Sequence, residues 1–111
     1  EVAKDPESVR GIVLGGSGMG EAIVSNRFKG VRCAGFYTPA LPPGAADVEG
    51  RASSDPLEIL KLTREHNDAN MLSLGARFLT RTQAQEAARK FLETPFPAAE
   101  RHARRVTMID E

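Results

Sequence analysis

Residues 11–21, which read G-I-V-L-G-G-S-G-M-G-E, carry the strongest chemical signal in the chain. An apolar run enters a glycine cluster, and a segment compatible with a helix follows. This order of strand, loop and helix start directs backbone N–H groups at an anion. Glu21 stands on the far side of the same loop, where a site that only bound phosphate would gain nothing from a carboxylate. The pattern therefore favours a site that binds an anion and also moves a proton.

Two further clusters strengthen this interpretation: Arg64-Glu65-His66-Asn67-Asp68 and Arg101-His102-Ala103-Arg104-Arg105. Each feature also has a structural interpretation. Ser17 can be a turn residue or a cap, and Glu21 in a first helical turn can interact favourably with the helix dipole. His66 can be a cap or surface residue at a helix end, and the arginines can form a solvated helix face. A purely structural reading requires all four of these to hold at once.

Alternating elements must position these side chains. Helical patterns come between and after three short apolar runs, and the first helix is expected from Gly20 to Phe28. An alternation of strands and helices predicts an α/β layer fold with a parallel sheet. The apolar runs are the length of buried parallel strands, and they are Gly11–Gly15, Val31–Tyr37 and Met71–Gly75.

Capping signals predict where the next two helices begin. Asp55 is expected as an N-cap, with Pro56 at the first helical position and Glu58 completing a capping box. Thr80 and Gln83 form a similar pair for the third helix. That helix carries an apolar stripe at helical spacing, made of Ala84, Ala87, Ala88, Phe91 and Leu92.

Leu41–Ser54 breaks the alternation. It contains three glycine or proline positions in a row and has no convincing period, so it is expected to be a long surface loop. A connection between a strand and a helix usually takes about 2–6 residues, so this segment is interpreted as an insertion. Pro95–Glu111 is expected to form a basic helical tail. Residues 1–111 are then a single domain with an insertion at about 41–54.

Strand topology predicts where the candidate residues lie. Ligands of parallel α/β sheets gather at the carboxyl ends of the strands, and the glycine loop and Arg77 each follow a predicted strand. His66 and Asn67 instead come just before a strand, so they fall at the opposite end of their own sheet. We therefore expect His66 to join the glycine-loop site most easily from a partner subunit.

Composition narrows the class of protein. The 111 residues have a formal net charge of 0 and are 41% hydrophobic, which is typical of a folded domain and not of a polybasic nucleic-acid binder. The single cysteine, Cys33, fits a reducing compartment and is expected to be a buried strand thiol. No apolar run approaches the roughly 20 residues of a membrane span, and no signal peptide precedes the first strand. We expect a cytoplasmic protein with no membrane or nucleic-acid partner.

The motifs together resemble the ribose-5-phosphate isomerase B family, whose relatives include galactose-6-phosphate isomerase. The resemblance runs from about Val9 to Ile109 and is most specific at R-E-H-N-D-A-N and R-H-A-R-R. It also covers G-I-V-L-G-G-S-G-M-G-E, N-R-F-K-G-V-R and G-A-R. It implies a Rossmann-like three-layer α/β sandwich, and a metal-free, cofactor-free isomerase acting on an open-chain sugar phosphate through an enediolate. It also implies a homodimer with sites shared across the interface.

The same resemblance implies residue roles. Glu21 is similar to the general base of the family. Some members use a cysteine at the position of Gly15 instead, and this chain has glycine there, so it is similar to the glutamate-type branch. Ser17 resembles a group that shuttles a hydroxyl proton, and His66 the acid that assists ring opening, with Asn67 holding a substrate oxygen. The remaining matches are Gly16, Ser17, Gly18, Met19 and Gly20 for the anion hole, and Arg77, Arg101 and Arg105 for the phosphate.

Two departures from the family pattern carry expectations of their own. The strand and Asp-His loop with which the family begins have no match before Val9, so an amino-terminal βα unit is expected to be missing and the chain to be a poor isomerase. Leu41–Ser54 expands a connection that is short in the family. A phosphosugar-binding module without turnover and a hexose-phosphate isomerase are the alternatives. Nucleic-acid binding through Arg101–Arg105 is weaker, because stacking aromatic residues are lacking there.

Overall fold

Three parallel strands form the sheet of the computed structural model, which describes residues 1–111. The strands are β1 (Gly11–Gly15), β2 (Cys33–Phe36) and β3 (Met71–Gly75), in the order β1-β3-β2. Both outer strands pair in parallel with β3, so β3 is central and each outer strand has one unpaired edge. The predicted α/β fold with a parallel sheet is confirmed.

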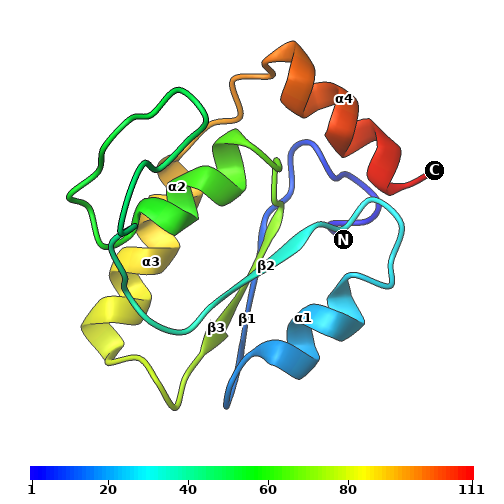
Figure 1. Cartoon of the computed structure of the whole chain (residues 1–111). Helices are drawn as coiled ribbons and strands as arrows, with labels where there is room; N and C mark the ends of the chain where they lie inside the picture. Colours follow the sequence, from blue (N-terminus) through cyan, green and yellow to red (C-terminus); the bar gives the residue numbers. More distant parts are fainter.

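Helices cover both faces of this sheet (Figure 1). Helix α1 (Met19–Ser25) packs on one face, and α2 (Glu58–Glu65) and α3 (Arg81–Glu93) lie together on the other. Helix α4 (Glu100–Ile109) lies beyond the amino ends of the strands, close to both chain termini. The sheet is therefore the middle of three layers, with α4 across one end.

The core lies between β3 and the α2–α3 layer. Leu72 and Leu74 of β3 are buried against Leu60 of α2 and Phe91 of α3. Complete burial of such a side chain contributes about 1.5–3 kcal/mol. On the other face of β3, the Ser73 hydroxyl donates a hydrogen bond to the Gly18 carbonyl at 2.6 Å and ties α1 to the sheet.

Two elements are shorter than the sequence predicts. Helix α1 ends at Ser25 because the Asn26 side chain pairs with the backbone of Cys33, donating to its carbonyl at 2.9 Å and accepting its N–H at 2.7 Å. Strand β2 begins at Cys33 because the Arg32 N–H donates to the Asn70 side chain and not to a strand partner. Cys33 is half-buried on this outer strand and not fully buried as predicted, and burial raises the pKa of its thiol.

The predicted start of α2 is wrong, whereas that of α3 is confirmed. Asp55 accepts the Leu57 N–H at 2.9 Å and stabilises a turn, and the helix begins only at Glu58. The Glu58 carboxylate pairs with Arg51 and so cannot complete a capping box. At α3, Thr80 and Gln83 make both hydrogen bonds of the predicted box, at 3.1 and 2.9 Å.

The segment between β2 and α2 contains no helix or strand and runs along the α2 side toward the start of α4 (Figure 1). The carboxyl-terminal segment predicted to be helical forms α4 over Glu100–Ile109. No helix in the chain has the length and apolar character needed to cross a membrane.

Candidate active site

The Glu21 carboxylate folds back over the loop that follows β1. A Cβ atom built on Gly15 would overlap the carboxylate of Glu21, so only glycine at position 15 leaves room for it there. Gly18 turns the chain into α1 with a left-handed φ of 78°, a conformation that glycine adopts without steric cost. The loop thus delivers a carboxylate to the carboxyl end of β1.

Arg77 lies over the neighbouring residue of the same loop. A Cβ atom on Gly16 would come within 3.1 Å of the Arg77 guanidinium carbon, and the Arg77 N–H donates to the Gly16 carbonyl at 3.0 Å. Gly75 lets the end of β3 approach the same loop closely, because a Cβ atom at position 75 would lie 2.7 Å from the Ser17 carbonyl oxygen. We call Gly15, Gly16, Ser17, Glu21 and Arg77 the loop group.

The other residues predicted for the anion hole line the start of α1. The Ser17 hydroxyl accepts the Met19 N–H at 3.2 Å in a local turn. The N-cap of α1 is Gly18, which has no side-chain capping hydrogen bond. Ser17, Met19 and Gly20 are exposed, and a Cβ on Gly20 would meet no atom within 4 Å. The use of backbone N–H groups of Gly16–Gly20 to bind an anion stays a prediction.

A second group lies at the amino end of the sheet. The imidazole rings of His66, at the end of α2, and His102, on α4, stack with centroids 4.4 Å apart and an angle of 16°. Arg101 donates from Nε to His102 Nε2 at 3.3 Å, and Arg105 follows one turn later on α4. We call His66, His102, Arg101 and Arg105 the imidazole group.

His102 is the residue that the sequence analysis did not select. It is only 8% exposed, and burial lowers its pKa, with His66, Arg101 and Arg105 adding to the shift and Glu49 opposing it. Its acceptor role toward Arg101 also requires an unprotonated Nε2. Val106, four residues after His102 and so on the same face of the helix, was the available signal that this position faces the molecule.

The two groups lie at opposite ends of the sheet. The loop group follows the carboxyl ends of β1 and β3, whereas His66 and Asn67 precede β3 and the arginines lie on α4 beyond its amino end (Figure 1). One copy of the chain therefore does not bring Glu21 together with His66. This is the separation that the strand topology predicted.

Part of the Arg64–Asp68 cluster is structural. Arg64 is 3% exposed and donates to Asp68 at 2.7 Å, to the Ala69 carbonyl at 2.6 Å and to the Thr94 carbonyl at 2.9 Å. Its guanidinium carbon also lies 5.9 Å from the centre of the Phe91 ring. Arg64 and Asp68 of this cluster are therefore engaged in structural contacts, whereas His66 and Asn67, which the sequence analysis selected, are not part of this network.

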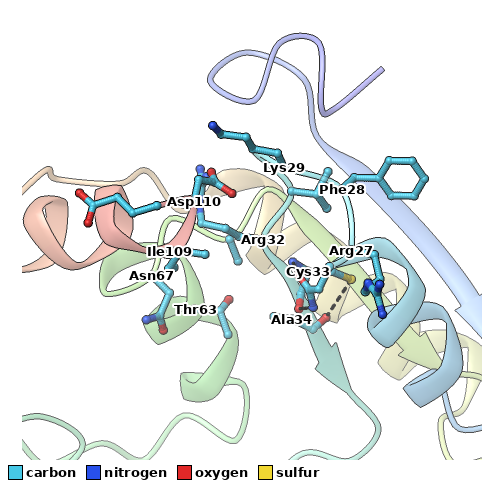
Figure 2. A pocket seen from close by; sticks show the side chains of 14 residues that line it. Arg27, Phe28, Lys29, Arg32, Cys33, Ala34, Thr63, Asn67, Ile109 and Asp110 are labelled. Carbon is cyan, nitrogen blue, oxygen red and sulfur yellow. Dashed lines mark hydrogen bonds between the residues drawn. The ribbon is translucent and has the colours of Figure 1, made fainter.

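A hollow of about 660 Å³ opens beside Asn67 (Figure 2). It lies between the α1–β2 connection, the end of α2 and the end of α4, and its wall includes Arg27, Lys29 and Ile109. Asn67 is the one predicted site residue that lines it, and the loop group lies elsewhere. No cluster of three or more His, Cys, Asp or Glu side chains has an arrangement that could hold a metal ion.

The fold and these groups define a class: a parallel α/β protein with a carboxylate on a glycine loop and a histidine–arginine group at the other end of its sheet. The family model described as "Ribose/Galactose Isomerase" matches residues 1–41 and 52–109. The chain belongs to this ribose/galactose isomerase family.

Individual relatives agree with this assignment. Ribose-5-phosphate isomerase B of Mycolicibacterium paratuberculosis is 36% identical over 107 residues, which is 96% of this chain and 55% of the relative. A putative sugar phosphate isomerase of Bacillus subtilis is 34% identical over 92% of this chain and 56% of its own length. The crystal structure of ribose-5-phosphate isomerase B from Mycoplasma genitalium with bound ribulose-5-phosphate superposes with a TM-score of 0.78 at 28% identity, over 98% of this chain and 59% of that one. The chain spans about half the length of the curated relatives it matches.

Proposed function

We propose that the chain carries the active-site groups of an aldose–ketose isomerase that interconverts ribose 5-phosphate and ribulose 5-phosphate through an enediolate. The observation that carries this proposal is the Glu21 carboxylate folded over Gly15, next to the Arg77 guanidinium over Gly16. A carboxylate and a cation at one glycine loop suit the removal of a carbon-bound proton and the binding of the resulting anion.

Glu21 acts as the general base in this scheme. It takes the proton from C2 of the open-chain aldose, and the electron pair left on C2 forms the enediolate with the C1 carbonyl. The loop N–H groups of Gly16–Gly20 stabilise the charge that develops on oxygen. Glu21 then returns the proton to C1, while the Ser17 hydroxyl assists transfer of the hydroxyl proton.

The imidazole group supplies the remaining functions together with the neighbouring Asn67 and with Arg77 of the loop group. His66 assists opening of the sugar ring as an acid, and Asn67 holds a substrate oxygen. Arg101 and Arg105, together with Arg77, bind the phosphate, because a guanidinium can donate two parallel hydrogen bonds to it. Arg101 and Arg105 are exposed at positions i and i+4 of α4, so both guanidinium groups can reach the same ligand.

A homodimer unites the two groups. The loop group and the imidazole group lie at opposite ends of one sheet, so a complete site requires the imidazole group of a second copy. A twofold axis would create two identical shared sites. The names of the relatives support the reaction, and the Mycoplasma genitalium protein with bound ribulose-5-phosphate supports a sugar phosphate ligand.

The test of this function is the replacement Glu21→Gln. We expect ribulose 5-phosphate formation to fall by about 10²–10⁴-fold, with ribose 5-phosphate binding largely kept, because the amide cannot accept the carbon-bound proton. Glu86→Gln, at an exposed position of α3, is the matched control and should leave turnover unchanged. Near-normal turnover in Glu21→Gln would refute the assignment of the base.

A phosphosugar-binding module without turnover is the second candidate. The observation that favours it is that the chain spans about half the length of the relatives it matches. It predicts that the purified chain binds ribose 5-phosphate, forms no ribulose 5-phosphate and behaves identically after Glu21→Gln. The measurements just described therefore separate the two candidates.

A further inference from the structure

The long β2–α2 connection contacts the imidazole group through one residue. Glu49 Oε1 lies 2.7 Å from Nη2 of Arg101, although the two residues are 52 positions apart in the sequence. Both side chains are about half exposed, at 56% and 46%, so the contact is open to solvent and to a competing ligand. The family model does not match residues 42–51, which include Glu49.

The backbone around Glu49 is held in place by its neighbours. The Asp47 carboxylate accepts the N–H groups of Glu49 and Arg51, each at 3.1 Å, and pairs with the Arg51 guanidinium at 3.0 Å. Arg51 also pairs with Glu58, which is buried at the start of α2. Glu49 is therefore presented to α4 from a turn that is anchored to the body of the protein.

Glu49 is the one acidic residue among the groups that shift the pKa of His102. Besides Glu49, the charged or titratable groups that influence His102 are His66, Arg101 and Arg105, and none of these is an acid. Arg105 makes no ion pair, whereas Arg101 has Glu49. A carboxylate on a guanidinium presents the same kind of paired oxygen acceptors as a phosphate ester.

We propose that Glu49 weakens phosphate binding: its carboxylate pairs with Arg101, and a phosphate ester must displace it to bind there. This inference rests on the proposed function where it assigns Arg101 to the phosphate. An exposed ion pair of this kind weakens a competing ligand by only about two- to fivefold, because solvent screens it. Glu49 therefore lowers the affinity for phosphate esters without preventing their binding.

The experiment measures binding to the full chain by calorimetry, with inorganic phosphate and with ribose 5-phosphate as separate ligands. Glu49→Gln removes the charge and keeps the size of the side chain. Glu100 precedes Arg101 in the sequence and makes no ion pair. Glu100→Gln removes an equal charge and therefore controls for general electrostatics. Arg101→Ala and the double replacement Glu49→Gln/Arg101→Ala complete the set.

We expect Glu49→Gln to tighten both ligands by about two- to fivefold, and Glu100→Gln to change them by less than that. The gain should vanish in the Arg101→Ala background, and it should shrink as salt is raised because the pair is exposed. Unchanged or weaker binding in Glu49→Gln, a gain that survives Arg101→Ala, or no phosphate binding by any variant would overturn the proposal.

The two ligands and a turnover assay separate this inference from the proposed function. Tighter phosphate binding in Glu49→Gln without ribulose 5-phosphate formation would support the inference and refute the isomerase. If ribulose 5-phosphate forms and Glu49→Gln leaves the affinity for phosphate and ribose 5-phosphate unchanged, the isomerase is supported and the inference is refuted.

Discussion

Gly15 and Glu21 depend on each other through space at the scale of single residues. The carboxylate occupies the volume that any side chain at position 15 would need. The flexible Glu21 side chain can move away, whereas a backbone neighbour cannot. Glycine is therefore required at position 15 for the placement of the proposed base, and it is not required there for folding.

Replacement of Gly15 by alanine tests this coupling. We expect Gly15→Ala to change the free energy of unfolding by less than about 1 kcal/mol, and to reduce turnover as strongly as Glu21→Gln does. Gly75→Ala places a Cβ against the Ser17 carbonyl oxygen and Tyr37, and should cost about 1–3 kcal/mol. Gly35→Ala, which meets no atom within 4 Å, is the neutral control. Urea unfolding measures all three, and a strongly destabilised Gly15→Ala would contradict the prediction.

His102 makes stability depend on pH. Its pKa is lowered in the folded protein, chiefly by burial, so the unfolded chain takes up this proton first as pH falls. The free energy of unfolding should therefore decrease as pH falls through about 6.5, the ordinary histidine value, and recover as pH rises. His102→Gln keeps an acceptor for Arg101 and removes the titration. Urea unfolding at several pH values should show a weaker pH dependence in this variant, and equal slopes would exclude His102 as the cause.

At the scale of elements, Arg64 joins the end of α2, the start of β3 and the residue after α3. It donates to Asp68 and Ala69 in the α2–β3 connection and to Thr94 after α3, and the first two contacts hold the turn that follows His66 and Asn67. Asp68 has a positive φ of 46° and also pairs with Arg32 at 3.3 Å. The positions of His66 and Asn67, the proposed site residues of this motif, thus depend on the contacts of Arg64 and Asp68.

Replacing Arg64 by methionine should therefore destabilise the fold. We expect Arg64→Met to lower the free energy of unfolding by about 2–4 kcal/mol, because it removes one of the two cationic partners of Asp68 and leaves the Ala69 and Thr94 carbonyl groups without the Arg64 donor. Arg105→Met, at an exposed position of α4, should stay within about 0.5 kcal/mol of the native protein. Urea unfolding measures both. Similar stabilities for the two variants would show that the Arg64 contacts contribute little.

At the scale of the whole molecule, both outer strands have an unpaired edge, and the two halves of the proposed site lie at opposite ends of the sheet. Unpaired strand edges favour association. We therefore expect light scattering to detect dimers or larger assemblies of the purified chain. Association by itself does not show that the copies share sites, so a functional test is needed.

Mixing of inactive variants provides that test. Glu21→Gln and His66→Gln each remove one half of the proposed site, and a mixed dimer would contain one native site and one doubly altered site. An equal mixture should recover about one quarter of the native turnover, since half of the dimers are mixed. Each variant alone at the same concentration is the control. A mixture that remains inactive while exchanging subunits would show that the sites are not shared in this way.

The amino-acid sequence alone determined the alternation of strands and helices, the loop at β1, the Thr80 cap and the opposite placement of Glu21 and His66. These are local properties: apolar runs, glycine clusters and capping pairs act over a few residues, and parallel strands fix which end each loop occupies. The boundaries at Asn26, Asp55 and Glu58 were not predictable in this way. Asn26 bonds to the backbone of Cys33 and Glu58 pairs with Arg51, each seven positions away, and Asp55 pairs with Lys90 of α3. These partners lie beyond the few residues that a capping pattern covers.

Only the tertiary structure decided how the motif residues divide between structure and chemistry. Arg64 and His66 belong to one short motif, yet one is a buried junction and the other stacks on His102. Glu49 approaches Arg101 from an aperiodic loop. These contacts join residues far apart in the chain, and their existence depends on packing and on the competition between charged partners. No local sequence pattern encodes that competition, so it became visible only once the chain was folded.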